Sequence, residues 1–279
     1  MADTAFQTQY RQEFIAAFEY GESRLRSATI TDSVVKGNEA TFLVAGTGGA
    51  EAVTRGVNGM IPARPDDLTQ YTATLLEWHD KPRRTNFNIF ASQGDGRRIM
   101  QMGTVKVMNR KIDSDIITQL DTATVTAGAA ATASLNMVAK AKTILGNAEV
   151  DVTDADNMFG LITPAFDAYL IQTKEYASAD YVEVKPFAGP AKKYMRWMGV
   201  NWIVHPRLTG GGTSSESCFL FHRDAIGHAV NTGGMDVSAG YNDEDDYYWA
   251  RSSIFMGSKL LQNSGVVKML HDGSAYTGS

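Results

Sequence analysis

Four consecutive carboxylates, Asp243, Glu244, Asp245 and Asp246, run directly into Tyr247, Tyr248 and Trp249. Clustered carboxylates can bind a metal ion or exchange protons, so this run is the first candidate for chemistry. A calcium-binding loop that began at Asp243 would need glycine at its sixth position and glutamate at its twelfth, where Tyr248 and Ile254 stand. Adjacent carboxylates on an extended chain also point to opposite sides. The run is therefore expected to be an exposed acidic loop, solvated or facing another subunit, and not a metal site.

The stretch FLVAGTGG at 42–49 is the second candidate, because a strand that ends in a glycine-rich turn resembles a dinucleotide-binding fingerprint. The third glycine of that fingerprint would fall at position 51, where Glu51 stands. The helix that should receive the pyrophosphate is interrupted by Gly56, Gly59 and Pro62. We therefore expect no nucleotide site and no bound cofactor.

Histidine and cysteine form no catalytic pattern in this sequence. The five histidines, at 79, 205, 222, 228 and 271, lack the close spacing of metal ligands. Cys218 and His222 would lie about 13 Å apart along an extended strand, which is too far for a nucleophile and its base. Cys218 is expected to be buried and structural. Nothing in these motifs predicts an enzyme, although a soluble enzyme with an unrecognised site remains an alternative.

Composition gives no sign of a membrane or nucleic-acid-binding surface that covers the whole protein. The net charge is −5, and no stretch approaches 18 apolar residues. The single cysteine excludes an intrachain disulfide, and the first residues lack the pattern of a secretory signal. We expect a soluble protein made inside the cell. Basic pairs such as Arg97 and Arg98 are local, and a solvated helix face explains them better than bound nucleic acid does.

The spacing of apolar residues predicts the elements that carry these motifs. Residues 4–28 are expected to form an amphipathic helix, either as part of the core or as an arm that docks on a neighbour. A strand at 40–46, an irregular stretch at 47–68 and extended chain at 69–91 together predict a long projecting hairpin. Residues 97–122 show the strongest helical period, and at 1.5 Å per residue this helix would be about 40 Å long, which suits a structural strut.

The rest of the chain alternates between helices and strands. Helices are expected at 134–146 and 165–177, and strands at 159–164, 195–205, 217–222, 225–230, 249–261 and 266–270. This order of elements predicts a mixed α+β fold with a projecting hairpin.

In that order the segments resemble the major capsid (coat) proteins of tailed bacteriophages, which have the Hong Kong 97-type fold. The resemblance covers nearly the whole chain. It begins with an arm (FQTQYRQEFIAAFEY), an extended hairpin loop (GGAEAVTRGVNGMIPAR to TNFNIFA) and a helix that ends in RKIDSDIITQLDTA. It continues with LITPAFDAYLIQTKEYASADYV, FLFHRDAIGHAV and YYWARSSIFMGSKLLQNSGVVKML.

The resemblance implies a division of the chain into the parts of a capsid subunit. Residues 1–42 would form the N-terminal arm and first strand, and 43–91 the extended loop. Residues 92–134 would form the spine helix of the peripheral domain and its connection. Residues 135–240 would form the axial domain, and 241–279 the strands that return through the peripheral domain and the C-terminus.

A capsid subunit of this kind self-assembles into pentamers and hexamers of an icosahedral shell, and the resemblance implies the same here. The implied partners are other copies of the chain, a portal protein, scaffolding or decoration proteins, and packaged double-stranded DNA bound without sequence specificity, but no membrane. The implied location is the virion, after assembly in the cytoplasm of the bacterial host. A nanocompartment shell of the same fold, which packages enzymes, is the alternative. The covalent lysine–asparagine crosslink of some relatives is not transferred, because the extended loop contains only Lys81, near its base.

Two groups of residues are the candidate contacts between subunits. The first is the aromatic stripe of the arm, and the second pairs the acidic run with arginines of the extended loop of an adjacent subunit. The candidates are Phe6, Tyr10, Phe14, Phe18, Arg55, Arg64, Arg83, Arg84, Asp243, Glu244, Asp245 and Asp246.

Overall fold

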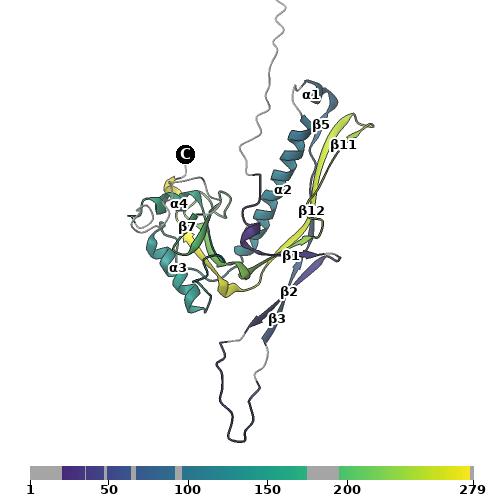
Figure 1. The fold of residues 1–279 in the computed structure, drawn as a ribbon. Coiled ribbons are helices and arrows are strands. Elements are labelled where there is room, and N and C mark those ends of the chain that lie inside the picture. Colours follow the sequence, from purple (N-terminus) through teal and green to yellow (C-terminus); the bar gives the residue numbers. More distant parts are fainter. Residues whose placement is uncertain are drawn as a thin grey trace, which may run out of the picture.

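The computed structural model describes residues 21–34, 36–46, 49–63, 67–91, 96–174 and 195–276. Figure 1 shows two lobes and a thin hairpin that projects from them. One lobe combines a six-stranded sheet with the long helix α2, and the other combines a five-stranded sheet with helices α3 and α4. One continuous cluster of buried apolar side chains extends through both lobes. The expected α+β class is confirmed.

The six-stranded sheet is organised around β12 (Tyr247–Leu260). Strands β10 (Ile226–Asn231) and β11 (Asp236–Asn242) pair antiparallel along one edge of β12, and β4 (Leu76–Asp80) and β5 (Arg83–Thr85) pair along the other. Strand β1 (Ile30–Val34) lies parallel to β10. Along β12, Ala250, Ser252, Ile254 and Met256 are buried while Arg251 and Phe255 are exposed, so the strand has one buried face and one outer face.

Helix α2 (Gly96–Leu120) packs across the buried face of this sheet, close to the predicted range of 97–122. Its buried side chains recur every four residues at Met108, Ile112, Ile116 and Leu120, which makes one continuous apolar stripe. Thr104 and Ser252 are also buried, and the Ser252 hydroxyl donates a hydrogen bond to the Thr104 hydroxyl over 2.8 Å. This contact fixes the helix against the middle of β12.

The five-stranded sheet has the order β13 (Val266–His271), β9 (Glu216–His222), β6 (Met158–Ile162), β8 (Val200–Val204), β7 (Met195–Trp197). Strands β6 and β8 are parallel, and the other neighbours are antiparallel. Cys218 on β9 is fully buried, as predicted, and burial raises the pKa of its thiol to about 12.

Helices α3 (Leu135–Asn147) and α4 (Pro164–Ile171) begin at side-chain caps. The hydroxyl of Ser134 accepts a hydrogen bond from the amide of Met137, and that of Thr163 accepts one from Phe166. Pro164 suits the first turn of α4 because proline has no amide hydrogen to leave unpaired there.

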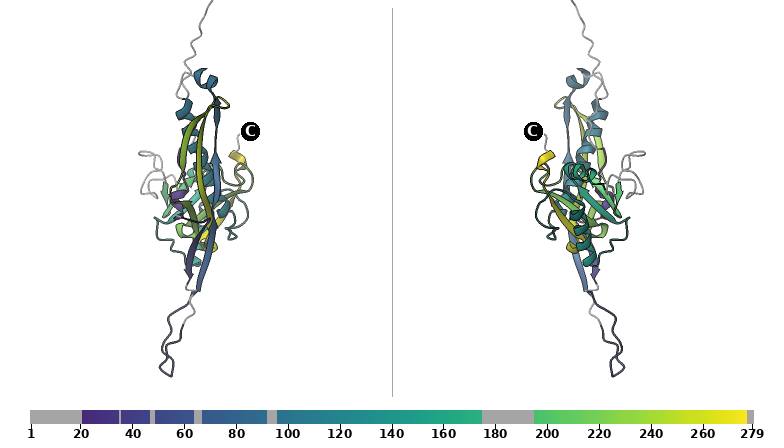
Figure 2. Two further views of the ribbon diagram at one scale, coloured as in Figure 1. Left: turned by 90° about the vertical axis from the view of Figure 1, so that its right-hand side faces the viewer. Right: turned by 90° about the vertical axis from the view of Figure 1, so that its left-hand side faces the viewer.

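Strands β2 (Glu39–Gly46) and β3 (Asp67–Thr74) pair only with each other and form the hairpin that Figures 1 and 2 show projecting from the body. Beyond them, residues 49–63 extend the hairpin without further strand pairing. Near the tip, Gly56 donates a backbone hydrogen bond to Met60 over 3.0 Å, and Gly59 donates one back to Gly56 over 2.8 Å. Gly59 has φ +72°, a conformation that favours glycine.

Two expected elements are wrong in the structure. The extended chain predicted as far as residue 91 ends at Thr85, and Asn86–Ala91 forms helix α1, because the Thr85 hydroxyl accepts a hydrogen bond from the amide of Asn88 over 3.4 Å. The helix predicted at 4–28 is absent from 21–28, which contains only the 3-10 turn η1 (Arg26–Ala28). Residues 4–20 of that predicted helix lie outside the described residues.

Other expected elements change in extent. The strand predicted at 195–205 is divided into β7 and β8 by a turn at Met198 and Gly199, both with positive φ. Helix α4 ends at Ile171, before the predicted end of 165–177. Strands β1 and β11 were not predicted, because ITDSV and DVSAGYN show little apolar alternation. Within the described part of the chain, no helix has both the length and the apolar character needed to cross a membrane.

The end of β3 at the base of the hairpin packs closely against β12 at Gly257. A Cβ atom at this position would overlap the backbone carbonyl of Thr74, at the end of β3, and backbone atoms cannot rotate away as a side chain can. We expect Gly257→Ala to lower the free energy of unfolding by about 1–3 kcal/mol, measured by denaturant titration.

The matched control is Gly103→Ala on α2, where an added Cβ meets no atom within 4 Å. Alanine favours a helix over glycine by up to about 1 kcal/mol, so this variant should be equally or more stable. Equal stability of Gly257→Ala and the unchanged chain would contradict the close approach of β3 to β12.

Candidate functional site

The described residues contain no arrangement suited to catalysis by known side-chain sets. Among them no three His, Cys, Asp or Glu side chains lie close enough together to hold a metal ion. Ser258 and His228 lie together, with the Ser258 hydroxyl 3.0 Å from Nδ1 of His228, but Asp115 contacts the serine and not the histidine. In a hydrolytic triad the carboxylate orients the histidine. His228 is fully buried, which lowers its pKa to about 4, so the ring is neutral and structural.

The acidic run occupies the turn between β11 and β12, and its four residues are exposed, as predicted. The amide of Glu244 donates to the Asn242 side chain over 2.9 Å. Asp246 adopts φ 47°, its backbone oxygen accepts from the amide of Asn86, and its carboxylate accepts from the Tyr241 hydroxyl over 2.5 Å. That hydrogen bond raises the pKa of Tyr241 to about 12. Asp246 therefore shapes the turn, while the other three carboxylates face solvent.

The structure separates the arginines that were expected to act together. Arg83 and Arg84 lie on β5, whose backbone pairs with Tyr247 to Trp249 next to the acidic turn of the same chain. The Arg83 guanidinium lies 4.9 Å from the centre of the Tyr247 ring. The prediction that these two arginines lie on the projecting loop is therefore wrong, because β5 pairs with β12. Arg55 is exposed next to the turn at Gly56 near the hairpin tip, and Arg64 lies outside the described residues. Figure 1 shows the hairpin and β5 at opposite ends of the molecule.

Exposed apolar side chains gather on the hairpin. They are Leu43, Val53, Val57, Met60, Ile61 and Leu68, each at least 61% exposed. Val57 at the tip is fully exposed. An exposed apolar surface of this kind is typical of a surface that binds another protein. The residues predicted here from the sequence are arginines and not these apolar residues, although the apolar letters of VNGMIP in a segment without periodicity were a usable signal.

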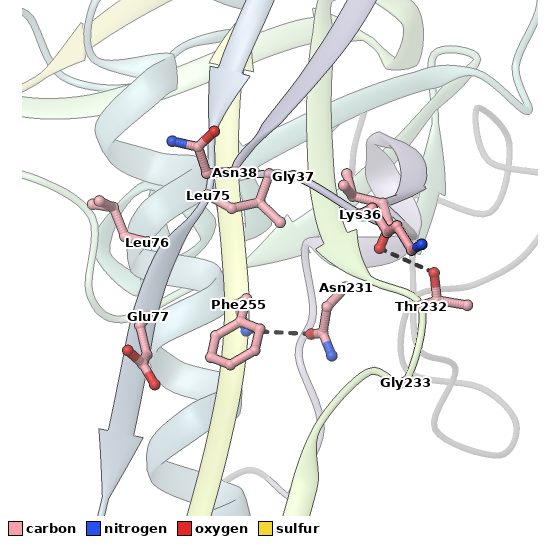
Figure 3. Close-up of a pocket in the computed structure, with 11 residues that line it drawn as sticks. Lys36, Gly37, Asn38, Leu75, Leu76, Glu77, Asn231, Thr232, Gly233 and Phe255 are labelled. Carbon is pink, nitrogen blue, oxygen red and sulfur yellow. Dashed lines mark hydrogen bonds between the residues drawn. The ribbon is translucent and has the colours of Figure 1, made fainter.

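A pocket of about 500 Å³ lies at the base of the hairpin, beside the outer face of β12 (Figure 3). Leu75, Leu76 and Phe255 supply apolar surface, and Lys36 and Glu77 lie at its rim. The side chain of Leu76 is 55% exposed and that of Phe255 is 43% exposed. The pocket is therefore a second apolar surface, on the body of the molecule.

A buried carboxylate holds the first residues that the structure describes. Asp113 of α2 accepts hydrogen bonds from the Ser23 hydroxyl over 2.6 Å and from the amides of Leu25 and Arg24 over 3.1 and 3.2 Å. Nε2 of His205, just after β8, lies 3.5 Å away. Burial acts to raise the pKa of Asp113, but the hydrogen bonds outweigh it and the pKa lies below its usual value.

The same segment is attached on both sides of Asp113. The Asn109 side chain donates to the backbone oxygen of Gly21 over 2.7 Å, and the Arg24 guanidinium donates to the backbone oxygen of Val204. The expected arm contacts Phe6, Tyr10, Phe14 and Phe18 precede this attachment and lie outside the described residues.

Comparison with known proteins places this geometry among viral shells. The family model for phage capsid protein matches residues 2–273. A search of curated proteins found no match. The solved capsid of cyanophage P-SCSP1u matches with a TM-score of 0.70 at 10% identity, over 96% of this chain and 93% of that one.

Two further capsids give similar agreement. The capsid of Ralstonia phage GP4 matches with a TM-score of 0.67 at 13% identity, over 100% of both chains. The capsid of a native GTA particle matches with a TM-score of 0.68 at 12% identity, over 93% of both chains. At these identities the likeness shows the fold, which agrees with the resemblance found in the sequence.

The attachment at Asp113 predicts a pH-dependent contribution to stability. At neutral pH, Asp113→Asn removes the charge that strengthens these hydrogen bonds, and we expect it to lower the free energy of unfolding by roughly 2 kcal/mol. Because the folded pKa is depressed, the contribution of Asp113 is present above the unfolded pKa of about 4 and is lost as the pH falls through the folded value. Denaturant titrations across pH should show that the difference in free energy of unfolding between Asp113→Asn and the unchanged protein disappears below about pH 4.

Asp151→Asn is the control, because Asp151 is exposed and accepts hydrogen bonds from the nearby residues Thr153 and Asp154, so it joins no distant parts of the chain. It should change stability far less. If the difference in free energy of unfolding between Asp113→Asn and the unchanged protein persists at low pH, the shape of the side chain and not its charge accounts for the effect.

Proposed function

The chain belongs to the phage capsid protein family, and on that premise we propose that its copies form the pentamers and hexamers of an icosahedral shell in a tailed, double-stranded DNA bacteriophage. The observation that carries the proposal is the hairpin, which exposes apolar side chains that no other part of the described chain covers. Such a surface favours association with another copy. The proposed fold subtype is the Hong Kong 97 type.

The energetics of the hairpin are suited to association. Burial of one Val, Leu, Ile or Met side chain contributes about 1.5–3 kcal/mol. Association costs about 4–15 kcal/mol in translational and rotational freedom. The several exposed apolar residues of one hairpin can therefore offset that cost only when most of them are covered together. Partial contacts would be weak and reversible, which allows errors in assembly to be corrected.

We propose that the pocket at the hairpin base receives the hairpin tip of a second copy. Val57, Met60 and Ile61 at the tip match the apolar lining of Leu75, Leu76 and Phe255. The charges are complementary, since the tip carries Glu51 and Arg55 while the rim carries Lys36 and Glu77. The extended loop of one subunit would thus lie over its neighbour.

The other assignments follow from the family. The lobe with the five-stranded sheet would act as the axial domain at the capsomer centre, and α2 with the six-stranded sheet as the peripheral domain. The proposed location is the virion, after assembly in the bacterial cytoplasm. The proposed partners are a portal protein, scaffolding or decoration proteins, and packaged DNA bound without sequence specificity.

The direct test is negative-stain electron microscopy of the purified chain across a salt series, together with size-exclusion chromatography. Closed shells, tubes, or rings of five and six subunits are the expected result. A monomer or dimer that persists in the presence of a candidate scaffolding protein would overturn the proposal. Shells that enclose an enzyme when recovered from the native source, and no DNA, would indicate a nanocompartment.

The hairpin tip supplies a prediction about assembly. Val57→Asp places a charge in the surface that must lose water, so we expect assembled particles to fall at least about tenfold, the ratio that 1.4 kcal/mol produces. Because Val57 is fully exposed in the single chain, thermal unfolding of the unassembled subunit should not change.

Thr54→Asp is the matched control, since it adds the same charge to the exposed tip without removing an apolar side chain. It should assemble better than Val57→Asp. Equal loss in both variants would mean that charge, and not apolar contact, governs the tip.

The acidic turn supplies a prediction about salt. We propose that Asp243, Glu244 and Asp245 face a basic segment of an adjacent subunit, with Arg55 the remaining described candidate. Exposed ion pairs contribute only about 0–1 kcal/mol each and are screened by salt. Changing these three residues to Asn, Gln and Asn should therefore make assembly less sensitive to salt, measured by light scattering from 50 to 500 mM NaCl (roughly 14 to 4 Å Debye length).

Asp246 is left unchanged because it shapes the turn. A variant that neutralises three exposed acids elsewhere, Asp32, Glu149 and Asp151, controls for the change in net charge. If both variants show the same salt profile, the acidic turn makes no specific contact.

A further inference from the structure

An apolar groove of about 350 Å³ lies where the described chain begins. It is lined by Gly21, Gln101, Met102, Val105, Lys106 and Val237, so one wall is α2 and the other is β11. Met102 is 44% exposed and Val237 is 40% exposed. Farther along α2, Met108 and Ile112 are buried. Met102 and Val237 thus leave apolar surface partly exposed beside a helix whose neighbouring turns are packed.

The path of the chain leads into this groove. The amides of Leu25 and Arg24 are bound at Asp113, and the oxygen of Gly21 is bound at Asn109. Moving back from 25 to 21 therefore follows α2 from 113 to 109, which is about one helical turn. The next positions on the same side of the helix are Val105 and then Gln101 and Met102, which line the groove. Residues that precede Gly21 enter the groove if they keep this direction.

The preceding sequence has the chemistry to fill it. In FIAAFEYG, which spans 14–21, Phe14 and Phe18 are four residues apart and would share one side of a helix. Their rings match the apolar lining formed by Met102, Val105 and Val237. Glu19 is acidic, and Lys106 at the groove is basic, so the charges are complementary as well.

We propose that residues 14–20 pack along α2 of their own chain and place the Phe18 ring in this groove. The segment that can extend to a neighbouring subunit is then 1–13 and not 1–20. At 3.3–3.6 Å per residue, the maximum reach of the arm falls from about 70 Å to about 45 Å. The inference concerns a single chain and does not depend on the proposed assembly.

A disulfide between engineered cysteines tests the position of Phe18. The protein with Phe18→Cys and Met102→Cys is oxidised as the full chain, and its products are separated by non-reducing electrophoresis. Cys218 is fully buried with its pKa raised to about 12, so its thiol stays protonated and does not compete. We expect a bond within one chain, seen as a monomer band of altered mobility that reverts on reduction.

The control pair is Phe18→Cys with Val107→Cys. Val107 is on the same helix and is 37% exposed, but five residues from Met102 it lies on another side of the helix. This pair should crosslink at least about tenfold more slowly, because a bond requires the two Cα atoms to lie within about 7 Å. Equal rates for both pairs would show an arm that is not docked. A dimer band from the Met102 pair would show that the arm of a second copy occupies the groove. Either result, or no crosslink at all, overturns the proposal.

Limited digestion with chymotrypsin gives a second measurement that needs no cysteine. Cleavage after Phe14 and Phe18 should be slower than cleavage after Phe6 and Tyr10, because docking protects the later sites. Met102→Asp should speed cleavage after Phe18 about tenfold, since digestion follows the population of the undocked form. It should leave cleavage after Phe6 unchanged. Cleavage at Phe18 that is already as fast as at Phe6 in the unchanged chain would contradict docking.

Discussion

The buried carboxylate of Asp113 is the interaction on which the arrangement of this protein depends. One side chain on the long helix accepts hydrogen bonds from the beginning of the described chain and lies beside His205, which follows a strand of the five-stranded sheet. A carboxylate without partners would be costly in this position. Because its partners come from two separate parts of the sequence, residues 23–25 and His205, both must be in place beside α2 for the charge to be satisfied. Residues 23–25, the long helix and the second lobe are therefore held together at one buried point.

The long strand β12 also joins several parts of the molecule, on the side of α2 that packs against the six-stranded sheet. Its buried face packs on the helix, one edge receives β10 and β11, and the other edge receives β4 and β5. The hairpin is attached to it at Gly257, and the acidic turn lies at its other end. The base of the hairpin and the acidic turn are thus attached to one continuous strand, which fixes the distance between these two points.

Residue patterns predicted the regular parts of this fold well. The three- and four-residue intervals between apolar residues identified α2, because that helix buries one face. The strand predicted at 249–261 corresponds to β12. The prediction failed at 21–28, where the side chain of Asp113, distant in sequence, binds the amides that a helix would use. It also missed β1 and β11, whose polar sequences become strands by pairing with β10 and β12. The candidate site was found only in part: the exposed acidic turn was anticipated, but the apolar hairpin residues look like core residues until the fold shows that nothing covers them.

The hairpin of β2 and β3 has a mechanical consequence. It is a two-stranded ribbon fixed at its base to β12 and described without a helix or third strand along its length. A ribbon clamped at one end behaves as a cantilever and bends more readily than a packed sheet, since bending it strains one ladder of hydrogen bonds and few side-chain contacts. Where two copies of the chain meet at different angles, bending of the ribbon can accommodate the difference while the lobes keep one shape. Bending would then be concentrated in one slender element, while the described lobes keep their packing.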